Sequence, residues 1–242
     1  MRKTEKIFYE KPTKFRTRST VVKLYPEHIE LASTVAYPEG GGQDSDKGTI
    51  TNKCTGMSLN FDHVKRIYGR DQKITDDHWV NVDGIILHHM VSPGQKLEKM
   101  FLEGDPVDIE IDEPRREKLS ISHSASHLLF MGIEKLRPFE TKRIIGCHIR
   151  EDQARFDLRT ENKFEPEDLA FIEKFANALI AQNLPIKTHA SEVHSDARFW
   201  ICDGVKIPCG GTHVSNAGTI TPLKIKRKGL GKNKERLSCL IG

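Results

Sequence analysis

The pattern of apolar residues changes at Asp112-Glu113-Pro114, and this change constrains the fold more than any other feature of the sequence. Before it, short runs rich in Thr, Val and Ile alternate with Pro and Gly, which is typical of β-strands joined by turns. After it, apolar residues recur at helical spacing over long segments. The sequence therefore predicts an α+β protein of two domains, residues 1–112 and residues 113–242.

Residues 1–112 are predicted to form a small β-barrel or sandwich of short strands. The expected strands are Lys6–Tyr9, Ser19–Leu24, Ile29–Leu31, Gly48–Thr51, Trp79–Val82, Gly84–His88 and Val107–Ile111. Between Asn52 and Asp77 the chain is polar and irregular. We expect a surface insertion there.

Residues 113–242 are predicted to pack helices on a mostly antiparallel sheet. Acidic residues followed by Pro114 indicate a helix start, and Pro138 bounds its end. Along this helix the apolar residues fall on one arc, and His123 and His127 lie on the other side. A second helix is expected from about Pro166 to Gln182. The expected strands are Ala154–Arg159, Ile186–Ala190, Phe199–Cys202 and Thr219–Lys226.

Composition excludes several classes of protein. The five cysteines are odd in number and form no Cys-x-x-Cys, which argues against a secreted disulfide framework. No run of about 18 apolar residues occurs, and the first residues form no apolar leader, so we expect a cytoplasmic protein without a membrane segment. The net charge is only +4, but seven of the 38 Lys and Arg residues lie in Lys224–Arg236. Charge alone leaves open whether this stretch binds phosphates or is a solvated tail.

Two pairs of residues carry the ligand chemistry of a metal site. His123 and His127 are spaced i, i+4, which places them on one face of a helix, and Ser124 stands where a metalloprotease has its glutamate. Cys209 and His213 are separated by Gly-Gly-Thr, which permits a tight turn. Imidazole and thiolate together favour Zn²⁺. His213 is either a fourth ligand, which would close the site, or a residue that orients water and moves protons.

Three stretches carry a resemblance to a known family: Ala36–Ile50 with its glycine-rich run, Asp112–Arg116 leading into His123–Leu129, and Pro208–Val214. On these residues the chain resembles the alanyl-tRNA editing proteins (AlaX, medium-length type). These are free-standing relatives of the editing domain of alanyl-tRNA synthetase. The resemblance implies a glycine-rich N-terminal β-barrel domain followed by an α+β editing domain that contains zinc. The family is also described as binding nucleotides, including ATP.

The resemblance further implies an enzyme that deacylates mischarged tRNA(Ala), above all the seryl form and also the glycyl form. One Zn²⁺ per chain would be held by His123, His127 and Cys209, with His213 at the fourth family position. The expected partner is the acceptor end of the mischarged tRNA, with no DNA and no membrane. Monomer and homodimer are both left open.

The chemistry of ester hydrolysis assigns roles to the residues around the metal. A zinc-bound water has a pKa near ~7 and can attack an ester carbonyl. Backbone N–H groups at Gly210 and Gly211 are candidate oxyanion donors. Thr212, Ser124 and Ser126 are candidates for binding the seryl hydroxyl, which would spare alanine. Thr212 is equally well explained as a hydroxyl that stabilises the turn.

Further substrate contacts are expected outside the metal pairs. The glycine-rich run lacks the ending of a P-loop and the spacing of a dinucleotide fold. Gly41, Gly42 and Gln43 are expected to approach the tRNA acceptor end or the editing domain, and a turn that packs the two domains is equally compatible. Cys147 is expected to line the substrate pocket.

The basic residues are interpreted through the same resemblance. Lys226 and Arg227, in the basic stretch, would follow the tRNA backbone and give salt-sensitive affinity. Arg115 and Arg116 are further candidates for binding phosphate.

Two places depart from the family pattern close to the expected substrate. Ile121 stands where an arginine is usual, and Ile144-Ile145-Gly146-Cys147 replaces Gln-Lys-Gly-Ser. The competing interpretations are a non-enzymatic, zinc-dependent module that binds tRNA, and a deacylase for another misacylated tRNA, such as a threonine-family editing target.

Overall fold

The structure is a computed structural model that describes residues 3–76, 78–91 and 97–241. Its first half contains the strands and short helices β1 (Glu5–Lys6), α1 (Ile7–Glu10), β2 (Arg16–Leu24), β3 (His28–Leu31), β4 (Ser33–Thr34), β5 (Gly48–Asn52), β6 (Ser58–Thr75), β7 (His78–Met90), η1 (Leu97–Lys99) and β8 (Pro106–Ile111). Its second half contains α2 (Glu113–Leu136), η2 (Glu140–Arg143), β9 (Ile144–Ile149), β10 (Gln153–Arg159), α3 (Pro166–Ala181), β11 (Lys187–Ala190), β12 (Arg198–Cys202), β13 (Val205–Pro208), η3 (Ala217–Thr219), β14 (Lys224–Gly229) and β15 (Lys234–Leu240).

Six strands of the first half pair in the order β2-β3-β7-β6-β5-β8, and β8 pairs back with β2, so the ladder closes as an antiparallel barrel. Alternation along the strands fills its interior. In β8, Val107, Ile109 and Ile111 belong to the buried apolar cluster, while Glu110 between them is exposed. Asp108 on the outer side is bound instead by Arg16 of β2.

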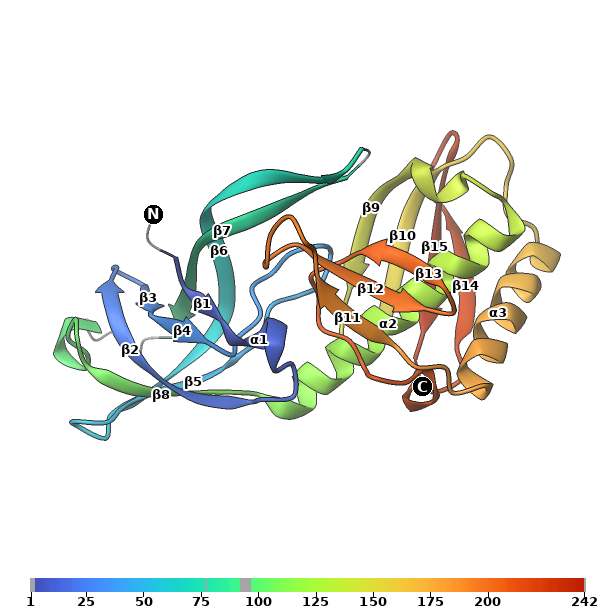
Figure 1. The fold of residues 1–242 in the computed structure, drawn as a ribbon. Coiled ribbons are helices and arrows are strands. Elements are labelled where there is room, and N and C mark those ends of the chain that lie inside the picture. The colour runs from blue at the N-terminus through green and yellow to red at the C-terminus, as the bar shows by residue number, and fades with distance from the viewer. Residues whose placement is uncertain (1–2, 77, 92–96, 242) are drawn as a thin grey trace.

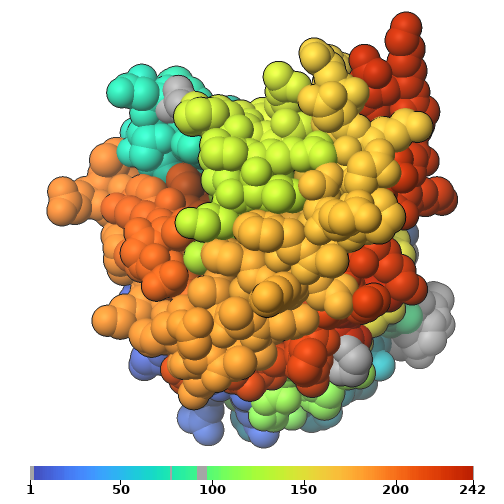
Figure 2. Space-filling model, turned by 90° about the vertical axis from the view of Figure 1, so that its right-hand side faces the viewer, coloured from blue at the N-terminus to red at the C-terminus, as the bar shows by residue number. Residues whose placement is uncertain are grey.

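The second half is built around α2, which contacts both of its sheets. Phe130 packs edge-on against Phe156 of β10, in the antiparallel sheet β14-β15-β10-β9. The ring of His127 lies 4.6 Å from that of Trp200, in the smaller sheet β11-β12-β13. α3 packs beside α2 and covers the outer face of this half (Figures 1 and 2). The expected α+β class with antiparallel sheets is confirmed, whereas the division into domains at residue 112 stays a prediction.

Both predicted helices are confirmed, with α2 at Glu113–Leu136 and α3 at Pro166–Ala181. α2 begins as expected, because the Asp112 side chain accepts a hydrogen bond of 3.0 Å from the Arg115 N–H. None of the helices in the described ranges has the length and apolar character that crossing a bilayer requires.

The expected insertion between Asn52 and Asp77 is wrong for the residues that the structure describes, which exclude Asp77. The strand β6 occupies most of the segment and pairs with β7. Leu59, Phe61 and Val64 face the barrel core, but beyond them β6 and β7 form a ribbon with many exposed side chains that leaves the barrel (Figure 1). Charged residues on both faces of this ribbon hide the alternation that would have predicted a strand.

Other element boundaries also differ from expectation. Ile7–Glu10 forms the helical turn α1 where a strand was expected. Trp79–Val82 and Gly84–His88 belong to one strand, β7, because the positive φ angles of Asp83 (60°) and Gly84 (72°) bend the strand without ending its pairing. The basic stretch is no tail, since it forms the hairpin β14–β15 within the four-stranded sheet.

The two halves meet at the start of α2, in a buried ion pair. Arg116 is 1% exposed and donates to both carboxylate oxygens of Asp46 and to Val35 O. Its neighbour Arg115 donates to Ser45 O at 3.0 Å. The expectation that these arginines bind phosphate is therefore wrong, because both are used to hold the segment after the glycine-rich run against α2.

His88 makes the stability of the barrel depend on pH. The ring is fully buried: Nδ1–H donates to Ile29 O at 3.1 Å, and Nε2 accepts from Thr34 Oγ1 at 2.9 Å. Burial lowers the pKa of His88 from 6.5 to about 4. Between these two pH values His88 binds a proton in the unfolded chain but not in the folded chain. The free energy of unfolding therefore has its full value above pH 6.5 and decreases as the pH falls toward 4. We expect a loss of about 2 kcal/mol between pH 7 and pH 5 from this residue.

Urea unfolding of wild type and His88→Gln at pH 7 and pH 5 measures this loss. The other buried histidines are common to both proteins, so the difference between the two pH dependences isolates His88. His78→Gln, at an exposed position, is the matched control. Equal pH dependences for wild type and His88→Gln would contradict the assignment.

Candidate metal centre

Four potential ligands converge from two places in the second half. His123 and His127 project from α2, and Cys209 and His213 come from the loop that follows β13. One ligand atom of each residue lies within 4.8 Å of the others. Cys209 Sγ lies 3.3 Å from His123 Nε2 and 3.3 Å from His213 Nε2. The two predicted pairs therefore form a single cluster.

Backbone geometry explains why this loop can reach the helix. Cys209 N–H donates to Arg198 O at 2.9 Å, which fastens the loop to β12. At Gly211 the backbone lies against the imidazole of His123, and a Cβ there would stand 2.1 Å from His123 Cε1. Only glycine permits this approach, so a glycine at position 211 is a requirement of the cluster.

Neighbouring polar groups orient the histidine rings. Gln43 Oε1, from the glycine-rich run, lies 2.7 Å from His123 Nδ1. The Ser124 hydroxyl donates to Ser120 O and lies 3.3 Å from His213 Nδ1. Because both oxygens can accept, each Nδ1 is assigned the proton, which leaves Nε2 of both rings free toward Cys209.

The cluster fits a metal ion. Both ring nitrogens of His127 are buried without a hydrogen-bond partner among the described residues, which is costly unless something binds them. Burial lowers the pKa of His123 to about 3 and those of His127 and His213 well below 6.5, so the imidazoles are neutral and able to ligate. Burial raises the pKa of the Cys209 thiol to about 12, and coordination would deprotonate it.

A cavity of about 590 Å³ opens beside the cluster. His123, His127 and Cys209 line it, whereas His213 is not among its lining residues. Of the predicted site residues, the cavity is also lined by Gly41, Ser126, Cys147, Gly210 and Gly211. The cluster is therefore reached from one side, with His213 behind it.

Thr212 and Ser124 do not line this cavity, contrary to the expectation that they bind a substrate hydroxyl. The Thr212 hydroxyl accepts from Gln43 Nε2 at 3.0 Å and from Ser120 Oγ at 2.9 Å. The Thr212 N–H donates to Gln43 Oε1 at 3.0 Å. Thr212 thus holds the turn, which was the alternative interpretation, and Ser124 supports His213.

The Gly211 N–H points at the Cys209 sulfur at 3.4 Å, so it is not free to serve as an oxyanion donor as expected. Such a hydrogen bond favours the thiolate. Of the two predicted donors, Gly210 is left.

The glycine-rich run packs on β9, in agreement with its interpretation as a structural turn. Gly42 O accepts from Ile149 N–H at 2.7 Å, and Asp44 N–H donates back to Ile149 O at 3.1 Å. Gly42 has a φ of +86°, and a Cβ there would stand 2.7 Å from Cys147 Sγ. Gln43 between them reaches the cluster rather than the cavity.

Lys226 and Arg227 lie apart from the cavity, on β14. Lys226 is exposed, and Arg227 pairs with the buried Glu235 of β15. Sequence analysis did not predict several residues from the first half that complete the cavity wall, among them Tyr9, Arg66 and Trp79. They belong to no motif, and two of them lie on the ribbon β6–β7, half of which was expected to be an insertion.

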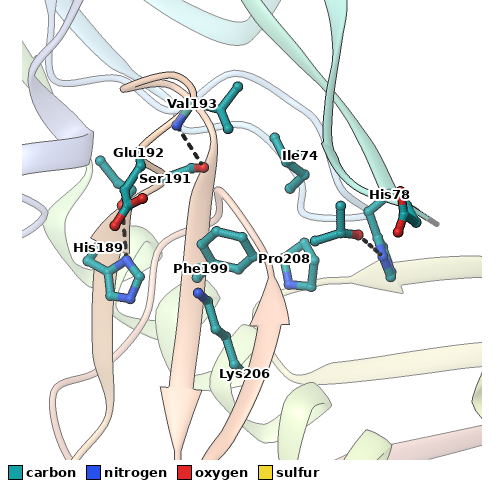
Figure 3. Close-up of a pocket in the computed structure, with 12 residues that line it drawn as sticks. Ile74, His78, His189, Ser191, Glu192, Val193, Phe199, Lys206 and Pro208 are labelled. Atoms are coloured by element: carbon teal, nitrogen blue, oxygen red, sulfur yellow. Dashed lines mark hydrogen bonds between the residues drawn. The ribbon is translucent and has the colours of Figure 1, made fainter.

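A second hollow of about 800 Å³ lies between the tip of the β6–β7 ribbon and the sheet β11-β12-β13 (Figure 3). Lys206 Nζ stands 3.9 Å from the ring centre of Phe199, and His78 Nδ1 lies 3.0 Å from Thr75 Oγ1. Its charges are mixed, with Asp76 and Glu192 among the lining residues. No group of metal ligands converges there within the described ranges. The smaller cavity beside the cluster is therefore the candidate site.

The chain, with its barrel and an α+β half that carries a cluster of three histidines and one cysteine, is similar in sequence to the alanine–tRNA ligases. No family model matches the chain. Over 99% of its length the chain is 29% identical to the alanine–tRNA ligase of Methanosarcina mazei, and 30% identical to that of Methanosarcina acetivorans. In the ligase of Methanocorpusculum labreanum it matches with 28% identity over the same share.

Each of these matches covers 26% of the ligase, so the chain spans about a quarter of the length of these relatives. The expected relationship to alanyl-tRNA synthetase is confirmed.

Gln43 is expected to raise the metal affinity of the cluster without touching the metal. In Gln43→Ala the His123 ring loses the acceptor that fixes its tautomer, and the loop loses its anchor at Thr212. We expect zinc affinity, measured by competition with a chromophoric chelator, to fall about 10- to 100-fold.

Gln182→Ala, at an exposed position next to α3, is the matched control and should bind zinc like wild type. Wild-type affinity in Gln43→Ala would show that this side chain does not support the cluster.

Proposed function

We propose that the chain is a zinc-dependent hydrolase that deacylates mischarged tRNA(Ala), with the seryl form as the main substrate and the glycyl form as a second one. The observation that carries the proposal is the cluster of His123, His127, Cys209 and His213, which opens on one side to a cavity in a relative of the alanine–tRNA ligases. A purely structural zinc site has no need of such a cavity.

Zinc is the metal that these donors favour, because imidazole and thiolate suit a borderline-soft ion with tetrahedral preference. With His123, His127 and Cys209 as its three protein ligands, the fourth position would be open for water or substrate. When bound, zinc lowers the pKa of a coordinated water toward ~7 and polarises an ester carbonyl. His123, His127 and Cys209 line the cavity and present this chemistry to it. His213 belongs to the cluster but does not line the cavity. An aminoacyl ester in the cavity therefore meets the cluster on its open side.

The residues around the cavity account for a preference for serine. The Ser126 hydroxyl donates to His123 O at 2.7 Å, which leaves its oxygen able to accept from a seryl hydroxyl. Burial raises the pKa of Cys147 to about 11, so its thiol is neutral at physiological pH and adds to the apolar wall formed by Phe130 and Phe156. Alanine offers no donor to Ser126, and the backbone at Gly210 is the oxyanion donor that we retain.

The origin of the site residues supports two domains that meet near residue 112. Residues 113–242 supply all four residues of the cluster. Residues 1–112 supply Gln43, which contacts His123, and part of the cavity wall. The site is complete only when both parts are in contact.

A basic groove is the proposed surface for the backbone of the tRNA acceptor end. It is a hollow of about 610 Å³ with five basic side chains, namely Lys142, Arg143, Arg159, Lys232 and Lys234, and with Glu161 as the acid among its lining residues. Ile144 lines both this groove and the cavity beside the cluster, so the two are adjacent. Arg227 pairs with Glu235, so we assign the backbone contact of the hairpin to Lys232 and Lys234 of the groove and to Lys226.

Cys209→Ala tests the hydrolase. We expect zinc to be lost and the deacylation of seryl-tRNA(Ala) to fall more than the ~10–100-fold typical of a change behind a metal ligand. The rates are measured with seryl-, glycyl- and alanyl-tRNA(Ala), and zinc by elemental analysis. Cys54→Ala, at an exposed cysteine, is the control.

Wild-type turnover by a zinc-free Cys209→Ala protein would sink the mechanism. If the wild type binds tRNA but cleaves no misacylated form, the chain is a zinc-dependent binding module. Cleavage restricted to another misacylated tRNA, such as a threonine-family target, would reassign the substrate.

The groove is tested by removing charge where we propose that the tRNA backbone lies. In the double variant Lys232→Ala/Lys234→Ala we expect KM for tRNA to rise several-fold with kcat unchanged, because these cations contact phosphates and not the ester. The slope of log affinity against log salt should flatten by about 1 to 2. Lys226→Ala outside the groove is the control, and a larger effect of Lys226→Ala would place the backbone on β14 instead.

A further inference from the structure

Part of the wall of the cavity beside the cluster comes from the β6–β7 ribbon and from side chains around it. Among these residues are Tyr9, Arg66, Trp79, Asn81 and Arg198. The proposed hydrolysis gives these residues no role. Figure 1 shows the ribbon leaving the barrel and reaching toward the second half, and in Figure 2 its tip stands beside the segment that contains β11–β13.

Arg66 carries a positive charge that no carboxylate neutralises within the described ranges. Its Nη2 donates to Tyr9 Oη at 2.7 Å, and its Nη1 donates to Asn81 O. Both acceptors are neutral, whereas the neighbouring Arg70 and Arg198 form ion pairs with carboxylates. A guanidinium has five N–H donors, so these two bonds hold it in place and leave donors for an anion in the cavity.

A short chain of contacts joins Arg66 to the metal-binding loop. The Tyr9 hydroxyl that accepts from Arg66 lies so close to Gly210 that a Cβ there would stand 3.4 Å from Tyr9 Oη. Gly210 directly follows Cys209. Arg66 is thus separated from the Cys209 loop by one tyrosine side chain, and an anion bound to Arg66 lies next to whatever is bound at the cluster.

Trp79 supplies an aromatic surface in the same part of the cavity wall as Asn81, whose carbonyl oxygen accepts from Arg66. Its side chain is 64% exposed although it lines the cavity, so a large part of the indole is free to be covered. Arg198 also stacks over the Tyr9 ring at 5.5 Å and stiffens this wall. An exposed indole beside an unpaired guanidinium is the combination that binds a nucleotide, with the base on the ring and the phosphate on the fork.

We propose that the ribbon forms a nucleotide subsite, in which Trp79 stacks on the terminal base of the RNA and Arg66 binds its phosphate. This subsite rests on the proposed function, because the ribose ester of that same nucleotide is what the cluster would attack. It extends the proposal by assigning the end of the RNA to residues of β6 and β7. The basic groove then holds only the backbone further from the ester.

The test uses an uncharged RNA hairpin that reproduces the acceptor arm of tRNA(Ala), with and without its 3′-terminal nucleotide. Binding to the zinc-loaded protein is measured by fluorescence anisotropy. We expect wild type to bind the complete RNA about ten-fold more tightly than the shortened one, in the range of one base stacked on an aromatic ring. Trp79→Ala should abolish this preference, and Trp79→Phe should keep most of it.

Tyr68→Ala is the matched control. Tyr68, on β6, is an exposed aromatic residue of the ribbon like Trp79 on β7, but it does not line the cavity. It should keep the full preference for the complete RNA. Arg66→Ala should reduce that preference, and Arg66→Lys should restore only part of it, since lysine lacks the fork. Thermal melting verifies that each variant is folded.

The preference is a ratio between two RNAs on one protein, so a general loss of affinity cancels out of it. A wild type without preference, or Trp79→Ala and Arg66→Ala variants that keep it, would overturn the subsite even if deacylation proceeds. Wild type could prefer the complete RNA and hydrolyse no misacylated tRNA, while Trp79→Ala abolishes the preference. That outcome would support the subsite and contradict the proposed hydrolysis. The two proposals are thereby distinguished.

Discussion

The buried ion pair between Arg116 and Asp46 is the interaction on which the arrangement of the site depends. Both side chains are at most 1% exposed, so each would be strongly destabilising without the other. The buried pair is tolerated because its remaining hydrogen-bonding groups also have partners. Arg116 donates to the carbonyls of Val35 and Pro12, and Asp46 accepts from the Tyr37 N–H at 2.6 Å. It fixes the first turn of α2 against the segment that follows the glycine-rich run.

This fixed contact explains how a residue from the first half supports a metal centre in the second. With Asp46 held at the start of α2, Gln43 three residues earlier lies beside His123, two turns further along the helix. One amide then bonds to His123 of the first pair and to Thr212, which lies between Cys209 and His213 of the second pair. The glycine-rich run thus supports the geometry of the cluster through Gln43, and its Gly42 serves close packing against β9.

The sequence predicted what depends on local spacing and missed what depends on partners. The cluster of potential ligands was predictable because His123 and His127 share a helix face and glycines between Cys209 and His213 allow a tight turn. Thr212 was not, since only the fold decides whether its hydroxyl meets a substrate or Gln43. β6 was missed because its outer half is exposed on both faces, so no alternation marks it. Arg66 reaches the cavity from that strand, and Trp79 reaches it from β7, which pairs with it.

Close packing also argues that the cluster is formed before a metal or a substrate arrives. Gly211 and Gly42 each sit where a Cβ would collide, one with His123 and the other with Cys147, so neither loop has room to shift toward its neighbour. The rings of His123, His127 and His213 are held at centroid distances between 4.3 and 5.1 Å. The ribbon wall is built differently, from an exposed indole and a guanidinium held by neutral acceptors. The cavity thus combines a rigid cluster with a more adaptable wall that suits a larger ligand. This combination is possible because two halves of one chain share the cavity.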